Sequence, residues 1–262
     1  MKVPLHVVEA RRSRLAALIQ AEGYLPIADV CARLAISEAT ARRDLAVLAG
    51  SNAITRTRGG ALVEYNQRFP SFRDRLDDSA TGKGRIAGAA RRMIKPGQTV
   101  WLDGGTTTYR IAEILARDPV ANLTVVTNNL PVAEILADGL PNKAEIAVHL
   151  LGGQYFRRGS LLIGGHALDH LKAWAFDLAF LGAEGMDGEG MWNSQAEIVA
   201  LQRAVAKRAP RAVFCLDAAK LGRRAPEFLL GWDRVDRLLT DATPAALKRA
   251  GISLPAKHLI AA

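Results

Sequence analysis

The sequence has few cysteines, few aromatic residues and no long hydrophobic run. Its two cysteines, Cys31 and Cys215, lie far apart in apolar segments, which favours buried free thiols in a reducing compartment over a disulfide or a metal pair. No apolar stretch approaches the roughly 18 residues that span a bilayer, and the N-terminus lacks the apolar core of a signal peptide. We therefore expect a cytoplasmic, soluble protein without a membrane partner.

Positive charge is in excess, and it is unevenly distributed. The formal net charge is +9 over 262 residues. Residues 101–200 carry more acidic than basic side chains, whereas the segments on both sides are basic. This charge gives weak support for binding nucleic acid, and the basic C-terminal segment has no assigned role. The length allows one large domain or two smaller ones.

Residues 36–48 have the pattern of an amphipathic helix that begins after Ser37. The serine is placed to cap the helix, and no Gly or Pro interrupts the following residues. At helical spacing, three apolar residues share the inward face, and these are Ala41, Leu45 and Leu48. The outward residues carry hydroxyl and guanidinium groups, and they are Thr40, Arg42 and Arg43.

The neighbouring segments predict a winged helix-turn-helix. Residues 14–21 and 27–34 repeat apolar residues at helical spacing, and only two residues separate the second helix from Ser37. Residues 53–62 alternate β-branched and basic residues around Gly59-Gly60, as a β wing would. We place the DNA-binding domain at residues 8–62.

In the functional interpretation, residues 36–48 enter the major groove of operator DNA and the wing holds the backbone. The candidate DNA contacts are Ser37, Thr40, Arg42 and Arg43 of the helix with Arg56 and Arg58 of the wing. The alternative is an ordinary solvated helix followed by a hairpin, because two exposed arginines are common. Spacing alone leaves both readings open.

A change of pattern separates this domain from the rest. Residues 63–82 mix Pro, Gly and charges without a period, so we place a linker there, which is either a short docked helix or a loose tether. Residues 83–262 alternate helices with short apolar strands, which predicts a doubly wound, mostly parallel α/β domain. The predicted helices are 85–93, 107–116, 131–137 and 195–208. The predicted strands are 99–102, 123–126, 146–151, 178–181, 212–216 and 235–240.

Small and polar residues follow several of these strands, where doubly wound domains bind ligands. The sequence Asp103-Gly-Gly-Thr-Thr-Thr108 is the most informative. Its glycines allow the backbone to approach a ligand closely, and the N-terminal amide groups of the helix that follows would point toward a bound anion. A phosphate is the natural ligand. A tight turn with hydroxyl caps is the alternative. The loop is neither a P-loop nor a dinucleotide fingerprint, which argues against ATP and NAD.

Both halves resemble the DeoR family of bacterial transcriptional regulators over nearly the whole chain. In the N-terminal half, Thr40-Ala-Arg-Arg-Asp-Leu45 lies between Leu34-Ala-Ile-Ser-Glu38 and Arg58-Gly-Gly-Ala61. The resemblance continues through Lys83-Gly-Arg-Ile-Ala87, Asp103-Gly-Gly-Thr-Thr107, Val126-Thr-Asn128, Leu151-Gly-Gly153, Asp177-Leu-Ala-Phe-Leu-Gly182 and Asp217-Ala-Ala-Lys220. The family's sensor domain is similar in fold to ribose-5-phosphate isomerase and glucosamine-6-phosphate deaminase.

The resemblance implies a sugar-phosphate effector bound at the strand ends. Gly104, Gly105, Thr106 and Thr107 would form the loop at the phosphate. Asp103, Thr127, Asn128, Glu184 and Lys220 would surround the sugar. Gly104 and Ala219 stand where serine is common in the family, and these departures bear on which effector is bound.

We therefore expect a transcriptional repressor of a carbohydrate operon, which binds double-stranded operator DNA as a homo-oligomer. We expect no cofactor, no metal and no catalytic residue. His166 and His170 lack a third ligand at a metal-site spacing, and Asp187, Glu189 and Glu197 lack a nucleophile partner. Two alternatives stay open. One is a sugar-phosphate isomerase or deaminase with an accessory DNA-binding domain, and the other is an architectural DNA-binding protein without an effector.

Overall fold

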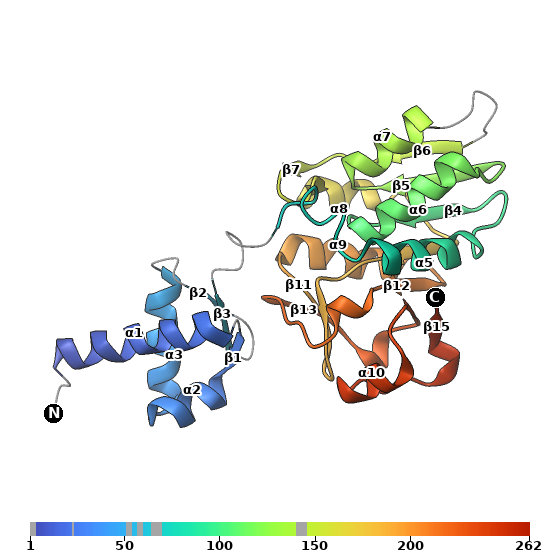
Figure 1. Ribbon diagram of the computed structural model, residues 1–262. Helices are drawn as coiled ribbons and strands as arrows, with labels where there is room; N and C mark the ends of the chain where they lie inside the picture. Colours follow the sequence, from blue (N-terminus) through green and yellow to red (C-terminus); the bar gives the residue numbers. More distant parts are fainter. Residues whose placement is uncertain (1–3, 23, 51–53, 57–59, 64–69, 140–145) are drawn as a thin grey trace. The chain divides into compact units, whose positions relative to one another are not determined.

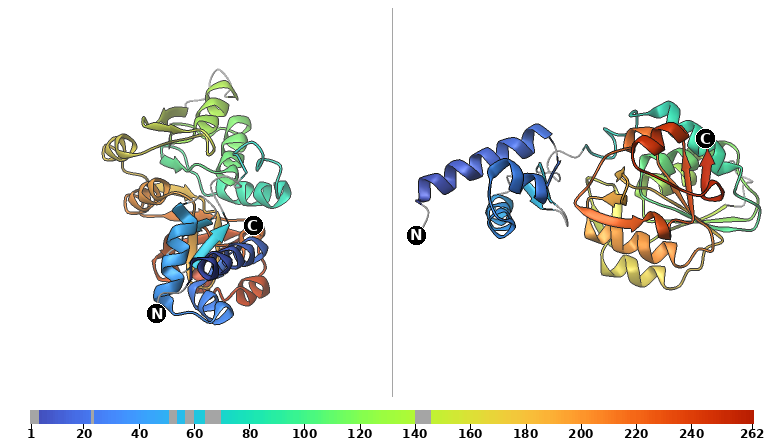
Figure 2. Two further views of the ribbon diagram at one scale, coloured as in Figure 1. Left: turned by 90° about the vertical axis from the view of Figure 1, so that its left-hand side faces the viewer. Right: turned by 90° about the horizontal axis from the view of Figure 1, so that it is seen from below.

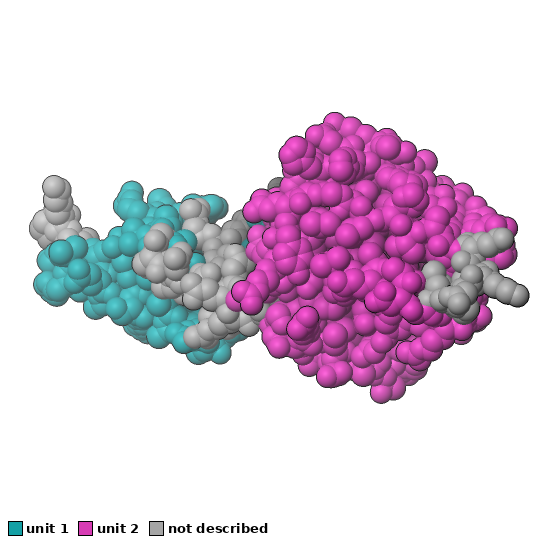
Figure 3. Space-filling view, turned by 90° about the horizontal axis from the view of Figure 1, so that it is seen from above, with its two compact units in different colours: residues 1–69, 224–228 teal, residues 70–223, 229–262 magenta. Residues whose placement is uncertain are grey.

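The structure is a computed structural model that describes residues 4–22, 24–50, 54–56, 60–63, 70–139 and 146–262. The chain forms two compact units (Figure 3). The N-terminal unit comprises residues 1–69 and 224–228, and the C-terminal unit comprises residues 70–223 and 229–262.

The N-terminal unit contains the predicted helix-turn-helix (Figure 1). Its helices are α1 (Leu5–Glu22), α2 (Ile27–Leu34) and α3 (Glu38–Gly50). Helix α1 begins nine residues before the predicted start at Arg14. The sequence pattern missed this half because Leu5 and Val7 are exposed there, so that apolar periodicity begins only near the buried Leu15.

A small antiparallel sheet completes this unit. Its strands are β1 (Tyr24–Pro26), β2 (Ile54–Arg56) and β3 (Gly60–Val63), in the order β1-β3-β2. Strands β2 and β3 confirm the predicted hairpin. Strand β1 was missed because three residues ending in proline are too short to display a period.

The C-terminal unit is built on the predicted parallel sheet. Seven strands, paired in parallel throughout, lie in the order β15-β14-β12-β9-β4-β5-β6. Their bounds are β4 (Thr99–Leu102), β5 (Leu123–Thr127), β6 (Ile146–Leu150), β9 (Leu178–Leu181), β12 (Ala212–Cys215), β14 (Arg237–Thr240) and β15 (Leu259–Ala261).

Helices cover both faces of this sheet (Figures 1 and 2). Alternate strand residues serve the two cores: Val100 and Leu102 pack with α5, α6 and α7, whereas Trp101 packs on the side of α8 and α9. The doubly wound fold is therefore confirmed. The helices are α5 (Ala80–Arg91), α6 (Thr106–Arg117), α7 (Leu130–Gly139), α8 (Gly165–Leu171), α9 (Ala196–Ala206) and α10 (Pro244–Arg249).

Several short elements escaped the sequence analysis because they are too short to display a period. The hairpin of β7 (Gln154–Phe156) and β8 (Leu161–Ile163) is the one that matters for the site. The others are β10 (Gly185–Met186), β11 (Gly190–Asn193), β13 (Glu227–Gly231), η1 (Ala218–Lys220), η2 (Trp232–Arg234) and η3 (Ala256–His258).

Residues 70–79, here called the strap, are docked on the C-terminal unit without forming a helix. Phe72 is buried, and its ring meets that of Tyr109 edge-on with centroids 5.6 Å apart. Two cationic side chains also hold the strap: Lys83 Nζ donates to the carbonyl oxygen of Arg75 at 2.7 Å, and Arg110 donates to that of Leu76 at 3.0 Å. Phe69, also expected to pack, lies outside the described residues.

The packing of Phe72 predicts that Phe72→Ala lowers the free energy of unfolding of the C-terminal unit by about 3 kcal/mol, through lost burial and a new cavity. Urea denaturation followed by tryptophan fluorescence measures this unit alone, because all four tryptophans lie in it. Tyr155→Ala, at an exposed aromatic residue, is the control and should cost less than about 1 kcal/mol. Equal losses of unfolding free energy in Phe72→Ala and Tyr155→Ala would show that the packing of the strap adds no stability.

Candidate nucleic-acid interface and ligand pocket

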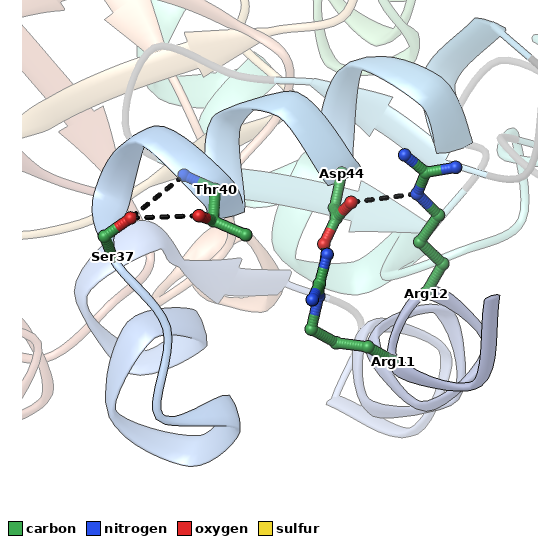
Figure 4. A network of polar contacts seen from close by, with 5 residues as sticks. All are labelled: Arg11, Arg12, Ser37, Thr40 and Asp44. Atoms are coloured by element: carbon green, nitrogen blue, oxygen red, sulfur yellow. Dashed lines mark hydrogen bonds and ion pairs between the residues drawn. The ribbon is translucent and has the colours of Figure 1, made fainter. Parts of the chain in front are cut away.

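Ser37 begins the recognition helix as predicted. Its Oγ accepts a hydrogen bond from the backbone N–H of Thr40 at 3.3 Å and lies 3.0 Å from Thr40 Oγ1 (Figure 4). This bond satisfies one of the first-turn amides that have no partner inside the helix. The cap defines where the exposed face of α3 starts.

That exposed face carries the predicted arginines. Arg43 is exposed, and Arg42 is exposed while forming an ion pair of 2.5 Å with Glu38 one turn earlier. Sequence analysis missed Val47, which is 45% exposed and follows Arg43 by one turn. An exposed apolar side chain beside arginines suits contact with thymine methyl groups in a major groove.

The wing is described only in part. Arg56 ends strand β2, and the structure describes its backbone position. Arg58 lies outside the described residues. The two wing arginines therefore stay predictions, whereas the antiparallel pairing of β2 with β3 is confirmed.

A buried carboxylate joins the recognition helix to α1. Asp44 is 1% exposed, and its two oxygens accept from Arg11 Nε at 2.6 Å and Arg12 Nε at 2.8 Å (Figure 4). Burial acts to raise the pKa of Asp44, but the hydrogen bonds from the two arginines outweigh it and lower the pKa. Sequence analysis missed this residue, although an acid three positions after Ala41 on the buried face was a usable signal.

We predict that Asp44→Asn destabilises the N-terminal unit by about 2 kcal/mol at neutral pH, a figure reduced because both arginines are partly solvated. Since the fold lowers the pKa of Asp44, this stabilisation is present above the unfolded-state pKa near 3.9 and is lost as pH falls through the folded-state value. Amide hydrogen exchange of α3 across pH measures it. Asp29→Asn, at an exposed acid of α2, is the control, and an unchanged exchange rate in Asp44→Asn would contradict the prediction.

In the C-terminal unit, the loop after β4 leads directly into helix α6. Gly105 is the N-cap residue, and it offers no side chain to the first-turn amides. Thr108 Oγ1 donates toward the carbonyl oxygens of Asp103 at 2.7 Å and Gly105 at 2.9 Å, which braces the loop. Thr106 and Thr107 are buried at the start of the helix. The geometry is that of an anion-binding helix terminus.

Asp103 lies beneath this loop and contacts the next strand end. Its Oδ2 accepts from the backbone N–H of Gly182 at 2.9 Å and from Gln202 Nε2 at 2.5 Å. Burial raises the pKa of Asp103, although these hydrogen bonds act against that shift. The carboxyl group therefore joins the ends of β4 and β9, and Gln202 of α9 is a hydrogen-bond partner of Asp103 that sequence analysis missed.

The end of strand β5 contributes a second polar group. Thr127 Oγ1 accepts from the N–H of Asn129 at 3.0 Å, and Asn128 Nδ2 donates to the carbonyl oxygen of Leu162 at 3.1 Å. Asn128 is 1% exposed, and its Oδ1 has no hydrogen-bond partner among the described residues. An unpaired buried acceptor is costly, so this oxygen is suited to a ligand hydroxyl.

The hairpin covers the Gly104 end of the loop. A Cβ atom added at Gly104 would lie 1.9 Å from Leu161 Cδ2, so the leucine occupies the space that a side chain at this position needs. Leu162 N–H and Leu130 N–H also bond to Asn128 O and Ser160 O, which fixes the hairpin on the end of β5. Serine is common at position 104 in the family that this chain resembles. Here the position is glycine, and the side chain of Leu161 occupies the space that a serine side chain would need.

A buried carboxylate, Asp217, follows strand β12 and acts electrostatically on two lysines. Asp217 is buried, its Oδ1 accepts from the N–H of Ala219, and its Oδ2 has no hydrogen-bond partner among the described residues. Burial lowers the pKa of Lys220, while Asp217 and Glu184 act to raise it. Ser194 donates to Glu184 Oε1 at 2.7 Å. Lys220, Asp217, Glu184 and Lys83, which influence one another's charge in this way, are here called the polar cluster.

Lys83 is the cluster member that sequence analysis missed. It is 2% exposed, and burial lowers its pKa to about 8 against the attraction of Asp217. Its spacing was a usable signal, because Lys83 shares a helix face with the buried Ile86, Ala87 and Ala90. A lysine on a buried face needs an anionic or carbonyl partner, and here it has Asp217 nearby and the carbonyl of Arg75.

Asp187 and His170, which were considered above as possible catalytic and metal-binding residues, form local hydrogen bonds. Asp187 Oδ1 accepts from the N–H groups of Glu189 and Gly190 and shapes a turn, while Gly152 N–H donates to His170 Nδ1 at 3.2 Å. Within the described ranges, no group of three or more His, Cys, Asp or Glu side chains is arranged to hold a metal ion. In that same part of the chain, no helix combines the length and apolarity needed to cross a membrane.

A helix-turn-helix unit combined with an α/β unit that gathers polar groups at its strand ends defines a class, the ligand-responsive DNA-binding regulators. Sequence comparison agrees with it. The DeoR-like helix-turn-helix domain matches residues 11–67, and the DeoR C terminal sensor domain matches residues 78–242. The chain therefore belongs to the DeoR family, and it is a DNA-binding transcriptional regulator, as predicted.

Relatives of this chain are themselves named as repressors. The HTH-type transcriptional repressor GlcR of Bacillus subtilis is 32% identical over 216 residues, which cover 82% of this chain and 81% of the relative. The glycerol-3-phosphate regulon repressor of Escherichia coli is 31% identical over 235 residues, with coverages of 89% and 91%. A solved ribose 5-phosphate isomerase A from Neisseria gonorrhoeae is similar over 53% of this chain and 52% of its own, with 16% identity and a TM-score of 0.38.

Proposed function

We propose that the chain represses a carbohydrate-metabolism operon and that a phosphorylated sugar at the strand ends of the C-terminal unit changes its affinity for operator DNA. The observation that carries this proposal is that the uncapped start of α6 after β4 and the buried Asp217 with Lys220 after β12 lie at the same edge of one parallel sheet. Cations and amide groups around buried acceptors suit a ligand that has a phosphate at one end and hydroxyls at the other.

On the DNA side, α3 enters the major groove, with Arg43 and Thr40 directed at base edges and Arg42 near the backbone. Ser37 sets the start of the helix, and Arg56 and Arg58 of the wing hold phosphates. Helix-turn-helix proteins commonly bind two half-sites as symmetric dimers, so we propose a homo-oligomer on a palindromic operator. We place it in the cytoplasm, where operator DNA lies.

On the effector side, the amides of Thr106 and Thr107, with Gly104 and Gly105, receive the phosphate, while Lys220 and Lys83 supply positive charge. The sugar hydroxyls face a set of oxygen and nitrogen groups from the other strand ends, and this set is Asp103, Thr127, Asn128 and Glu184. The name of the Escherichia coli relative, a glycerol-3-phosphate regulon repressor, supports a phosphorylated polyol or sugar as the class of effector.

The strap offers a physical route between the pocket and the wing. Lys83 contacts the strap through the carbonyl of Arg75, and the strap follows the wing along the chain after residues 64–69. An anion that attracts Lys83 competes with this carbonyl and so changes the docking of the strap. A coupling free energy of about 1–3 kcal/mol between effector and operator is expected.

An enzymatic role is the alternative function. Relatives that align with most of this chain are named as transcriptional repressors, which favours regulation. An isomerase would interconvert ribose 5-phosphate and ribulose 5-phosphate, and a deaminase would release ammonia from glucosamine 6-phosphate. Steady turnover of either substrate by the purified chain would establish the alternative.

For the DNA surface, we predict that Arg43→Ala weakens operator binding by about 1–3 kcal/mol and relaxes preference at one base pair, because it removes a contact to a base edge. Arg56→Ala should weaken binding to all sequences and reduce the salt dependence, as loss of a phosphate contact does. Fluorescence anisotropy on the operator and on single-base variants separates the two effects. A uniform loss in both variants would place the base-reading face elsewhere on α3.

For the effector pocket, we predict that Lys220→Met abolishes the response to the effector while leaving operator affinity within about twofold. The reason is that the ammonium group contacts the effector and lies in the C-terminal unit, not on α3. Lys248→Met, at an exposed lysine of α10, is the matched control and should keep the response. Loss of operator binding in Lys220→Met would make this lysine structural.

A further inference from the structure

A cavity lies in the C-terminal unit, between the strap and the turn of the hairpin. Its volume is about 700 Å³. Ser71, Phe72 and Arg73 line it on one side, and residues 155–158 with Ser160 line it on the other. None of these residues belongs to the strand-end pocket.

The walls of this cavity are strongly positive. Arg73, Arg157 and Arg158 all line it. Across the described part of the chain, neither the Arg73 nor the Arg157 guanidinium forms an ion pair or hydrogen bond with a carboxylate, and both residues are exposed. Arg158 is attracted to Asp74, whose carboxylate already accepts two hydrogen bonds from Ser71 at 2.8 and 2.9 Å. The cavity therefore keeps a surplus of positive charge.

The cavity is preformed, because hydrogen bonds and packing hold both walls. Phe72 N–H donates to the carbonyl of Arg158 at 2.9 Å, which joins the strap directly to the hairpin turn. Ser160 N–H donates to the carbonyl of Arg157 and closes that turn, and β7 and β8 pair in register on its other side. A cavity with fixed walls binds a ligand without a large ordering cost.

The lining also supplies aromatic surface. Phe156 is half-buried, and Tyr155 is 49% exposed beside the arginines. Guanidinium groups bind phosphate oxygens in a bidentate manner, and aromatic faces pack against planar rings or the apolar face of a sugar. The volume lies within the range of small-molecule pockets.

We propose that this cavity binds a small phosphate ester with at least two negative charges, at a site separate from the strand-end pocket. Its phosphate groups lie between Arg73, Arg157 and Arg158, and its organic part packs on Tyr155 and Phe156. Such a ligand bridges the strap and the hairpin turn, so it stabilises the contact that Phe72 N–H and the carbonyl of Arg158 already make between them. This places a second metabolite input on the regulator.

The test is isothermal titration calorimetry on the full chain with inorganic pyrophosphate, ATP and fructose 1,6-bisphosphate at fixed salt. It is done in the Lys220→Met background, so that the strand-end pocket does not contribute and failure of the proposed function does not affect the result. We expect one site that binds at least one of these compounds with submillimolar affinity. Arg73→Glu combined with Arg157→Glu should weaken that binding at least tenfold.

Lys248→Glu combined with Arg249→Glu, at two exposed basic residues of α10, changes the net charge by the same amount, and this matched control should leave binding unchanged. Both tested arginines are exposed, so the double variant should fold, and thermal denaturation checks this. If the control and the double variant weakened ligand binding equally, the loss of affinity would come from net charge alone, and the proposal would be overturned. Absence of binding to all three compounds would overturn it as well, and a loss of operator affinity in the double variant would then assign the arginines to DNA phosphates.

Discussion

The cost of burying charge is the constraint on which the pocket depends. Lys83 and Asp217 are buried, burial also lowers the pKa of Lys220, and isolated buried charges are unfavourable unless they are paired. Asp217 attracts both lysines, and the carbonyl of Arg75 in the strap accepts from Lys83. The need to pair buried charge therefore holds the strap against the C-terminal unit. In the proposed mechanism, an anionic effector competes for the same lysines.

Both units bury a charged side chain that groups of opposite charge stabilise, and the sign of the buried charge differs between them. In the N-terminal unit, Arg11 and Arg12 of α1 surround the buried Asp44 and hold the helix that carries the exposed arginines. In the C-terminal unit, Asp217 after β12 attracts the buried Lys83 and Lys220. In each unit, a charge of one sign is thus stabilised by opposite charge from a neighbouring element. Rigid positioning of this kind is what base contacts and phosphate contacts require.

Periodicity in the sequence predicted the elements that carry these surfaces. The bounds of β4 and β9 were correct to the residue, because short apolar runs between turns have few other solutions. The cap at Ser37 and the helix after Gly105 were also predictable from local chemistry. Contacts between distant segments were not: nothing in the sequence pairs Asp44 with Arg11, Lys83 with Arg75, or Gly104 with Leu161. The β7–β8 hairpin was missed because strands of three residues show no period.

In the proposed mechanism, one phosphorylated sugar and operator DNA are coupled through this chain. Fluorescence anisotropy of the purified protein on DNA from upstream of its own gene cluster, titrated with phosphorylated and free sugars at fixed salt, measures this coupling. We expect sequence-dependent binding that one or two sugar phosphates change by about 5- to 150-fold, while free sugars have no effect. Binding without sequence preference, or unchanged by every sugar phosphate, would contradict it.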